Sequence, residues 1–250
     1  PTLLWFRNDL RLTDKPALAW AVERGGAVIP VFIWSPEEEA SWSPGAASRW
    51  WLHQSLRALD LALRGRGLRL VLRSGGALPA LEALLAQTGA SAVAWNRRYE
   101  PGMAAREERL SDRLRSNGIA AESFNASLLF EPGDVLNRSG HPFRVFTAFW
   151  KACRASEAVL APLDAPKRIG VPANWPESLT LASLELEPKM DWAAGIRAAW
   201  QPGEAGAQAR LERFLNESLS AYAEGRNRPD RPDTSRLSPH LRFGEIGPRQ

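Results

Sequence analysis

AVIPVFIW, residues 27–34, is an almost unbroken apolar run, and it decides the fold class. It lacks the alternation of apolar and polar residues that marks a strand with one face in water. Strands of this composition are buried on both faces, as in parallel sheets that helices cover on both sides. The run therefore predicts a central strand of an α/β sheet.

Short apolar runs alternate with amphipathic stretches on both sides of this strand, over the first 125 residues. This spacing is typical of a parallel sheet built through helical crossovers. The sequence therefore predicts an α/β fold, a five-strand parallel Rossmann-like sheet with helices on both faces. We expect the other strands at Thr2–Phe6, Leu68–Leu72, Ala92–Trp95 and Ile119–Phe124, and helices at Asp14–Arg24, Ala46–Arg64, Leu78–Gln87 and Met103–Asn117.

The pattern changes after residue 125, because eight prolines interrupt the periodicity up to residue 203. Within this stretch only Phe143–Ala155 is predicted to be helical, and its aromatic residues are interpreted as packing. A second amphipathic helix is expected at Gly206–Ala223. We divide the chain into an α/β domain (1–125), an interdomain connector (126–203) and the beginning of a helical domain (204–250). Because there is no initiator methionine and a helix is expected to run on at Gln250, we expect a truncated piece of a longer protein.

Composition narrows the function classes only a little. The formal net charge is +4 and the pI about 9.7, a mild basic bias that is compatible with nucleic acid. A single cysteine excludes an intrachain disulfide and fits a reducing compartment, and no apolar run approaches the ~20 residues of a membrane span. We therefore expect a cytoplasmic protein that binds no membrane. The three histidines are too scattered for a metal site or a nucleophile–base pair, so we expect no metal.

A polar turn near the end of the chain has the composition of an anion site. The segment Thr234–Ser238 carries three hydroxyl groups within five residues, and Ser238 followed by Pro239 is typical of a helix N-cap with proline at the first helical position. Such a turn directs N–H and O–H donors at one point, in front of the positive end of a helix, and suits a phosphate or diphosphate. An ordinary capped helix start is the alternative.

A charged loop, Arg7–Arg11, follows the first strand. The glycine-rich dinucleotide fingerprint and the P-loop are both missing there. Ligands of open α/β sheets bind at the carboxyl ends of the strands, where this loop lies. Arg7 and Arg11 could pair with an acidic ligand, or with Asp9 in a structural ion-pair cluster, and both interpretations stay open.

Three strings resemble the photolyase/cryptochrome family: WFRNDLRL at residues 5–12, GHPFRVFTAFW at 140–150 and TSRLSPHLRFGEI at 234–246. The whole chain is similar to the N-terminal portion of that family, most of all to bacterial class I cyclobutane pyrimidine dimer photolyases. The resemblance implies that residues of the last thirty bind the FAD phosphates, with Leu237 contributing through its backbone. These residues are Tyr222, Thr234, Ser235, Arg236, Leu237 and Ser238. It also implies that Arg226 lies at the DNA-facing rim of the flavin pocket, where it contacts phosphate whatever the base sequence.

Residues 95–101 resemble the segment that holds the family's light-harvesting antenna chromophore. By that resemblance, Asn96 and Glu100 are its polar contacts. Folate-binding members also have a histidine shortly before the Ser-Pro that leads into the second helix, and here the stretch at 40–44 has none. A reduced folate, a deazaflavin or no antenna at all therefore remain open.

The activity implied by the resemblance is that of a deoxyribodipyrimidine photolyase. Light-excited reduced FAD donates an electron to a cyclobutane pyrimidine dimer flipped out of DNA, and the dimer splits. A cryptochrome-type photoreceptor, a 6-4 photoproduct photolyase and a non-photochemical nucleotide-binding protein are the alternatives. The catalytic residues are expected beyond Gln250, in a protein that is a monomer. We accordingly expect the 250-residue chain alone to bind FAD poorly and to repair nothing.

Overall fold

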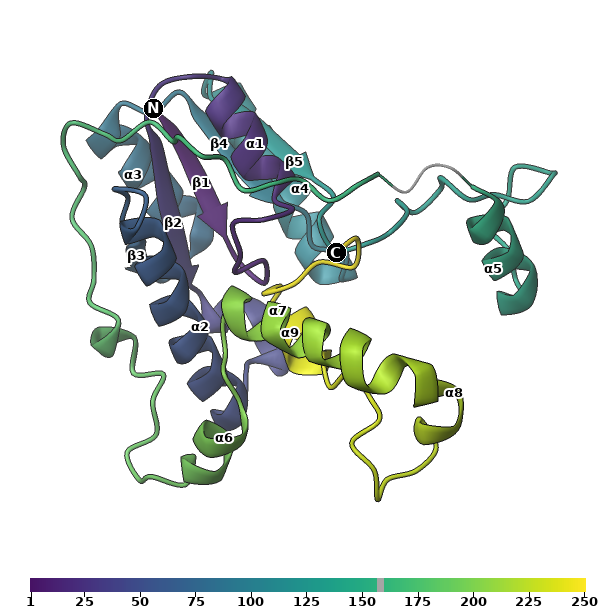
Figure 1. The fold of residues 1–250 in the computed structure, drawn as a ribbon. Helices are drawn as coiled ribbons and strands as arrows, with labels where there is room; N and C mark the ends of the chain where they lie inside the picture. Colours follow the sequence, from purple (N-terminus) through teal and green to yellow (C-terminus); the bar gives the residue numbers. More distant parts are fainter. Residues whose placement is uncertain (157–159) are drawn as a thin grey trace.

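The computed structural model describes residues 1–156 and 160–250. Five parallel strands form one sheet in the order β3-β2-β1-β4-β5 (Figure 1). The predicted five-strand parallel sheet is thus confirmed, and the first strand along the chain lies in the middle of the sheet. The strands are β1 (Thr2–Phe6), β2 (Val28–Trp34), β3 (Val71–Ser74), β4 (Ala92–Asn96) and β5 (Ala120–Phe124).

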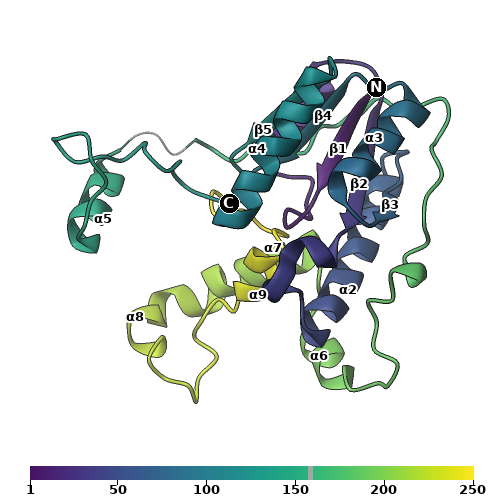
Figure 2. The ribbon, with the colours of Figure 1, turned by 180° about the vertical axis from the view of Figure 1, so that it is seen from behind.

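Helices cover both faces of the sheet, because successive side chains of each strand point to opposite sides. Leu4 packs with α1 (Pro16–Glu23) and α2 (Ala46–Arg64) in one core. Its neighbour Trp5 belongs to the second core, on the opposite face. That face carries α3 and α4, which come to the front when the molecule is seen from behind (Figure 2). These helices span Ala77–Thr88 and Pro101–Ser116.

The third strand begins later than the predicted Leu68–Leu72. It pairs only with the second half of β2, starting where Val71 lies opposite Val31. Before that point the N–H of Leu70 donates to the carboxylate of Asp60 on α2 at 2.8 Å, rather than to a strand. The Asp60 carboxylate therefore takes the place of a strand carbonyl as the acceptor for Leu70. Leu68 and Leu70 pack in the core from a loop.

The connector wraps around the outside of the sheet and returns beside β2 through a parallel bridge between Ala27 and Gly170. It includes α5 (Phe146–Ala155), η2 (Ala182–Leu184) and α6 (Ala194–Ala199). Helix α5 stands apart from the sheet (Figures 1 and 2). The interpretation of the aromatic residues of 143–155 as packing is correct for Phe143 and Phe149, which are half-buried and pack edge-on at 6.3 Å. It is wrong for Phe146, which is 73% exposed and stacks on Trp150.

The last part of the chain is a series of short helices. The expected helix Gly206–Ala223 is divided into α7 (Glu204–Arg213), η3 (Phe214–Ser218), η4 (Leu219–Ala221) and α8 (Tyr222–Gly225). A loop then leads to α9, which spans only Ser238–Arg242. The expectation that a helix continues at Gln250 is wrong, since Gly244 adopts φ +62° and turns the backbone away. None of the described helices has the length and apolar character needed to cross a membrane.

Candidate cofactor-binding sites

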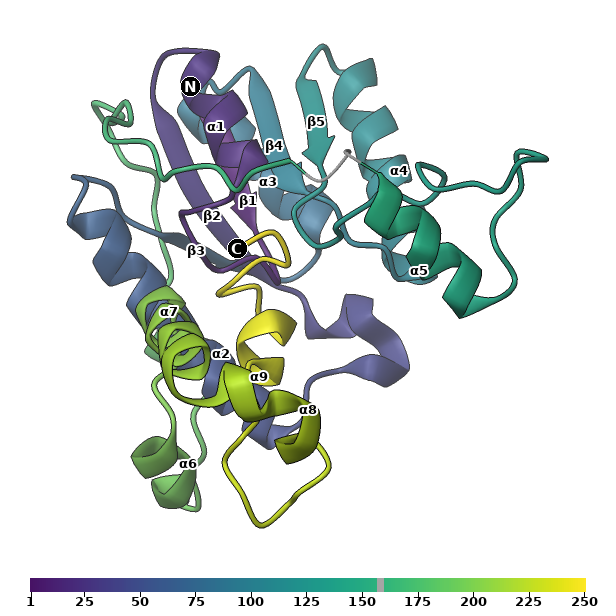
Figure 3. The same ribbon diagram turned by 45° about the vertical axis from the view of Figure 1, so that its right-hand side comes forward.

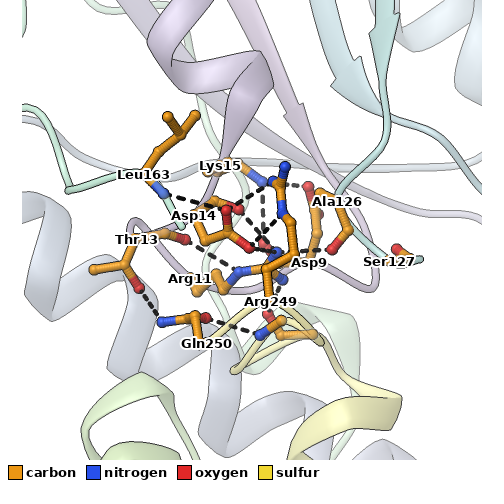
Figure 4. A network of polar contacts seen from close by, with 12 residues as sticks. Asp9, Arg11, Thr13, Asp14, Lys15, Ala126, Ser127, Leu163, Arg249 and Gln250 are labelled. Atoms are coloured by element: carbon orange, nitrogen blue, oxygen red, sulfur yellow. Dashed lines mark hydrogen bonds and ion pairs between the residues drawn. The ribbon is translucent and has the colours of Figure 1, made fainter. Parts of the chain in front are cut away.

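The loop that follows β1 joins distant parts of the chain (Figure 4). Arg11 is buried at its centre, and its guanidinium donates hydrogen bonds to four backbone carbonyl oxygens. They belong to Thr13 (3.1 Å), Asp14 (2.8 Å), Ala126 (2.8 Å) and Gly244 (3.0 Å). One side chain therefore ties this loop to the start of the connector and to the segment after α9.

A buried lysine reinforces the same loop. Lys15 forms an ion pair with Asp9 and lies 3.9 Å from the centre of the Phe6 ring. Burial lowers the pKa of Lys15 to about 8, although the attraction of Asp9 opposes the shift. Asn96 donates to the Asp9 carboxylate at 2.8 Å and accepts the N–H of Ala17 at 3.2 Å. The loop, β4 and the first turn of α1 are thus held by one polar cluster.

These contacts decide the question left open for the two arginines. Arg7 pairs with Glu107 of α4 and donates to the backbone carbonyl of Asn96. Both arginines are buried and bonded within the protein, as the structural interpretation expects, but the expected partner is wrong. Asp9 pairs with Lys15 instead. Asn96, predicted to touch an antenna, lies behind the strand ends with its side-chain oxygen and nitrogen both bonded inside the protein.

A pocket opens at the carboxyl ends of β1 and β2, at the edge where open α/β sheets bind ligands. Its lining combines aromatic rings with four arginines and one glutamate, so its charge favours an anionic, planar ligand. Three buried donors of this lining, Trp5 Nε1, Arg7 Nε and Arg106 Nε, have no hydrogen-bond partner among the described residues. The lining residues are Trp5, Arg7, Asn8, Phe32, Ile33, Trp34, Ser35, Glu39, Pro44, Ser48, Leu52, Arg98, Arg106, Arg242 and Phe243.

Ion pairs hold two of the pocket arginines in place. Arg98 pairs with Glu39 at 2.7 Å, and Arg106 pairs with Glu38 at 2.6 Å. Glu100, the second predicted antenna contact, is exposed and pairs with Arg98 at 2.8 Å. Partial burial opposes ionisation of Glu100, yet the hydrogen bonds from Arg98 keep its pKa below the ordinary value. Glu100 is outside the pocket lining and touches it only through Arg98.

The polar turn Thr234–Ser238 is open to solvent over most of its length. Its five N–H groups and three hydroxyls make no hydrogen bond within the described parts of the chain. Arg236 adopts a left-handed φ of +52°, which is strained for a side chain of this size and reverses the backbone. Its guanidinium lies 4.9 Å from the centre of the Trp200 ring. The turn therefore presents unused N–H and O–H donors on either side of Arg236.

The helix that follows this turn corrects one prediction. Leu237 occupies the N-cap position, Ser238 is already helical, and no side-chain capping bond is formed. Since α9 is only five residues long, its dipole adds little to anion binding. What remains available to an anion is the set of free donors.

Tyr222 begins α8 and Arg226 follows its last residue, and a loop leads from there to α9 (Figure 3). The Tyr222 ring packs edge-on against the Phe214 ring, with 5.6 Å between the ring centres. The Arg226 guanidinium lies 5.9 Å from the centre of the Tyr222 ring. Arg226 has no ion-pair partner among residues 1–156 and 160–250 and is exposed. The structure thus brings Tyr222 and Arg226 together, and no hydrogen bond, ion pair or ring contact joins either of them to the described residues of the turn.

Sequence reasoning missed a buried carboxylate beside these sites. Glu245 is fully buried, and its Oε1 accepts hydrogen bonds from Trp51 Nε1 (3.1 Å), Ser55 Oγ (2.5 Å) and the N–H of Gly203 (2.7 Å). Its Oε2 lies 2.5 Å from Nδ1 of His240. The available signal was Ser55, a polar residue four positions after Trp51 on the apolar face of its helix.

Comparisons with known proteins agree with this geometry. A family model described as DNA photolyase matches residues 2–167. A deoxyribodipyrimidine photo-lyase of Agrobacterium fabrum is 47% identical over 99% of this chain and 51% of its own length. Cryptochrome-1 of Arabidopsis thaliana is 41% identical over 100% of this chain and 37% of its own. The chain thus spans about half the length, or less, of these curated relatives.

Solved structures give the same result. A class III photolyase from Agrobacterium tumefaciens superposes with a TM-score of 0.94 at 47% identity, over 100% of this chain and 51% of that one. A Synechocystis cryptochrome gives 0.87 at 27% identity, over 100% and 54%. The class I subgroup was expected from the resemblance, whereas the structure from Agrobacterium tumefaciens is that of a class III photolyase. Class I and class III photolyases both belong to the DNA photolyase family, which is the family that the comparisons show.

Proposed function

Because this chain belongs to the DNA photolyase family, we propose that it forms the antenna-binding half and the first part of the flavin site of a deoxyribodipyrimidine photolyase. The observation that carries the proposal is the turn Thr234–Ser238, whose hydroxyl and N–H donors are unused and surround a strained Arg236. A diphosphate fits such a turn, because it needs several donors converging on its oxygens.

When bound, reduced FAD supplies the light-driven electron that splits a cyclobutane pyrimidine dimer in DNA. The residues of this chain bind and orient the cofactor. Thr234, Ser235 and Ser238 donate to the phosphates through hydroxyl and N–H groups, and Leu237 donates through its N–H alone. Tyr222 reaches the phosphates from α8. The exposed Arg226 provides a phosphate contact for the DNA strand.

We further propose that the pocket at the ends of β1 and β2 holds the antenna chromophore. The three unpartnered donors, Trp5 Nε1, Arg7 Nε and Arg106 Nε, fit acceptor atoms of a heteroaromatic ring. The arginines of the lining fit its anionic groups, and both a reduced folate and a deazaflavin have such groups. Glu100 acts by fixing Arg98, and Asn96 acts by fixing the loop behind the pocket.

The test is made on the full-length protein. An absorption spectrum is recorded first, followed by a light-dependent repair assay on an oligonucleotide that carries a thymine dimer. We expect flavin bands, a further near-UV band from the antenna, and recovery of thymine absorbance on illumination. Absence of flavin from the full-length protein would refute the proposal.

A cryptochrome-type photoreceptor is the second candidate, favoured by the 41% identity to Arabidopsis Cryptochrome-1. The same assay distinguishes the two, since a photoreceptor shows flavin bands and leaves the dimer intact. A 6-4 photolyase is distinguished by replacing the lesion with a 6-4 photoproduct. We place the full-length protein in the cytoplasm as a monomer, and sedimentation of the purified protein tests the oligomeric state.

A further inference from the structure

The four groups bonded to the Glu245 carboxylate come from three separate parts of the chain. Trp51 and Ser55 belong to α2, Gly203 precedes α7, and His240 lies on α9. A carboxylate that is fully removed from water needs such partners, because each missing hydrogen bond leaves charge uncompensated. Glu245 therefore fixes the position of α9 relative to α2.

Both of these helices also form walls of the candidate antenna pocket. Ser48 and Leu52 of α2 line it on one side, and Arg242 and Phe243, at the end of α9, line it on another. The Phe243 ring stacks on Trp51 at 6.2 Å with an interplanar angle of 12°. The hydrogen bonds of Glu245 to α2 and α9 therefore set the distance between these two walls of the pocket.

The same short helix begins in the candidate flavin turn. Ser238 is its first residue and Arg242 its last, so the two sites are separated by one helical turn, about 6 Å. Aromatic rings also connect the turn to α2. The ring of Trp200 packs 5.5 Å from that of Trp51, and the Arg236 guanidinium lies over the Trp200 ring. Any shift of α9 against α2 therefore moves the turn and the pocket wall together.

We propose that Glu245 is a positioning residue that serves both cofactor sites at once, an inference that rests on the proposed function. It holds the phosphate turn and the pocket wall at fixed positions against α2, without touching either ligand. Weakening its bonds loosens both sites in parallel, whereas a substitution within one site affects that site alone.

The test compares Glu245→Gln with Leu84→Ala in the full-length protein. Gln keeps an oxygen for Trp51, Ser55 and Gly203, and places an NH2 group against His240. Leu84 is buried on α3 in the core of the opposite face, so its truncation lowers stability without touching α2 or α9. FAD dissociation, the visible circular dichroism of bound flavin and backbone hydrogen exchange are measured for wild type and both variants.

For Glu245→Gln we expect FAD to dissociate about tenfold more readily, which corresponds to the loss of one strong buried hydrogen bond. Its flavin dichroism changes, and hydrogen exchange accelerates in residues 46–56 and 238–246 together. Leu84→Ala lowers the unfolding midpoint, leaves FAD dissociation and flavin dichroism unchanged, and accelerates exchange in the protected core as a whole rather than in these two segments. If Glu245→Gln does not fold, Trp51→Phe removes a single donor and keeps an aromatic, though smaller, ring at this position, with a smaller effect in the same direction.

Two results would overturn the inference. One is a Glu245→Gln protein that retains FAD as wild type does. The other is faster exchange in only one of the two segments, which would make Glu245 part of one site. Wild-type protein without flavin is a different outcome, since it removes the proposed function itself together with this inference.

Discussion

The Arg11 guanidinium donates a hydrogen bond to the carbonyl oxygen of Gly244 at 3.0 Å, across 233 positions of the sequence. The same guanidinium bonds Ala126, so it joins the three parts of the chain that the sequence suggested. A loop at the carboxyl end of a central strand commonly binds a ligand. In this protein Arg11 makes the loop an internal junction, while Arg7 and Asn8 of the same loop line the candidate antenna pocket.

Replacing Arg11 with Met should therefore destabilise the protein strongly. It leaves four buried carbonyl oxygens without a donor, and we expect a loss of about 3 kcal/mol or more in the free energy of unfolding. Urea denaturation measures the loss. Arg64→Met is the control, because Arg64 pairs with Asp60 at the surface and should cost less than about 1 kcal/mol. Equal losses for the two variants would contradict the junction.

Gly244→Ala tests how closely the last segment approaches the first loop. A Cβ at this position would lie 2.1 Å from the carbonyl oxygen of Asn8, with φ at +62°. Gly118→Ala is the matched control, since Gly118 has φ +77° and open space around it. We expect about 1 kcal/mol for Gly118→Ala, from backbone strain alone, and at least twice that for Gly244→Ala. Similar unfolding midpoints in thermal denaturation would refute the close contact.

The buried Lys15 predicts a pH dependence of stability. Its pKa is about 8 in the folded protein and 10.5 in the unfolded chain, so the unfolded state binds more protons between these values. The free energy of unfolding should therefore gain a contribution from Lys15 as pH rises from 8 to 10.5, and lose it as pH falls. Denaturation curves across this range should have a steeper positive slope for wild type than for Lys15→Met. Parallel slopes would mean that Lys15 keeps its ordinary pKa.

Ser238→Ala measures one donor of the flavin turn. Because Ser238 makes no capping bond, only a phosphate contact is lost, and we expect about 1 kcal/mol, a fivefold weaker affinity for FAD. Equilibrium dialysis of the full-length protein measures this affinity. Ser139→Ala, an exposed serine of the connector, is the control and should leave the affinity unchanged.

Arg226→Ala should weaken binding to dimer-containing DNA at low salt. If Arg226 neutralises one phosphate, the slope of log affinity against log salt concentration should fall in magnitude by about 0.9. Arg226→Lys should restore most of that slope, and Arg64→Ala, on α2, should leave it unchanged. An unaltered slope in Arg226→Ala would remove this residue from the DNA contact.

Much of the α/β sheet could be predicted from local pattern, because buried parallel strands and amphipathic helices carry their signal within a few residues. The edge strand β3 was misplaced, since its start depends on Val31 and on a hydrogen bond that the N–H of Leu70 donates to Asp60. The capping role of Ser238 was wrong because composition alone does not fix which residue turns first into a helix. Glu245 was missed because its partners on α2 are about 190 residues away.

The Arg11–Gly244 bond also has a consequence in time. At a synthesis rate of about 5–20 residues per second, Gly244 leaves the ribosome about 10–50 s after Arg11. The first strand of the sheet is therefore made early, while the loop behind it lacks its final partner throughout that interval. In the nascent chain the Arg11 guanidinium therefore lacks its Gly244 acceptor until the last segment has been made. Completion of this junction is among the last events in folding residues 1–250.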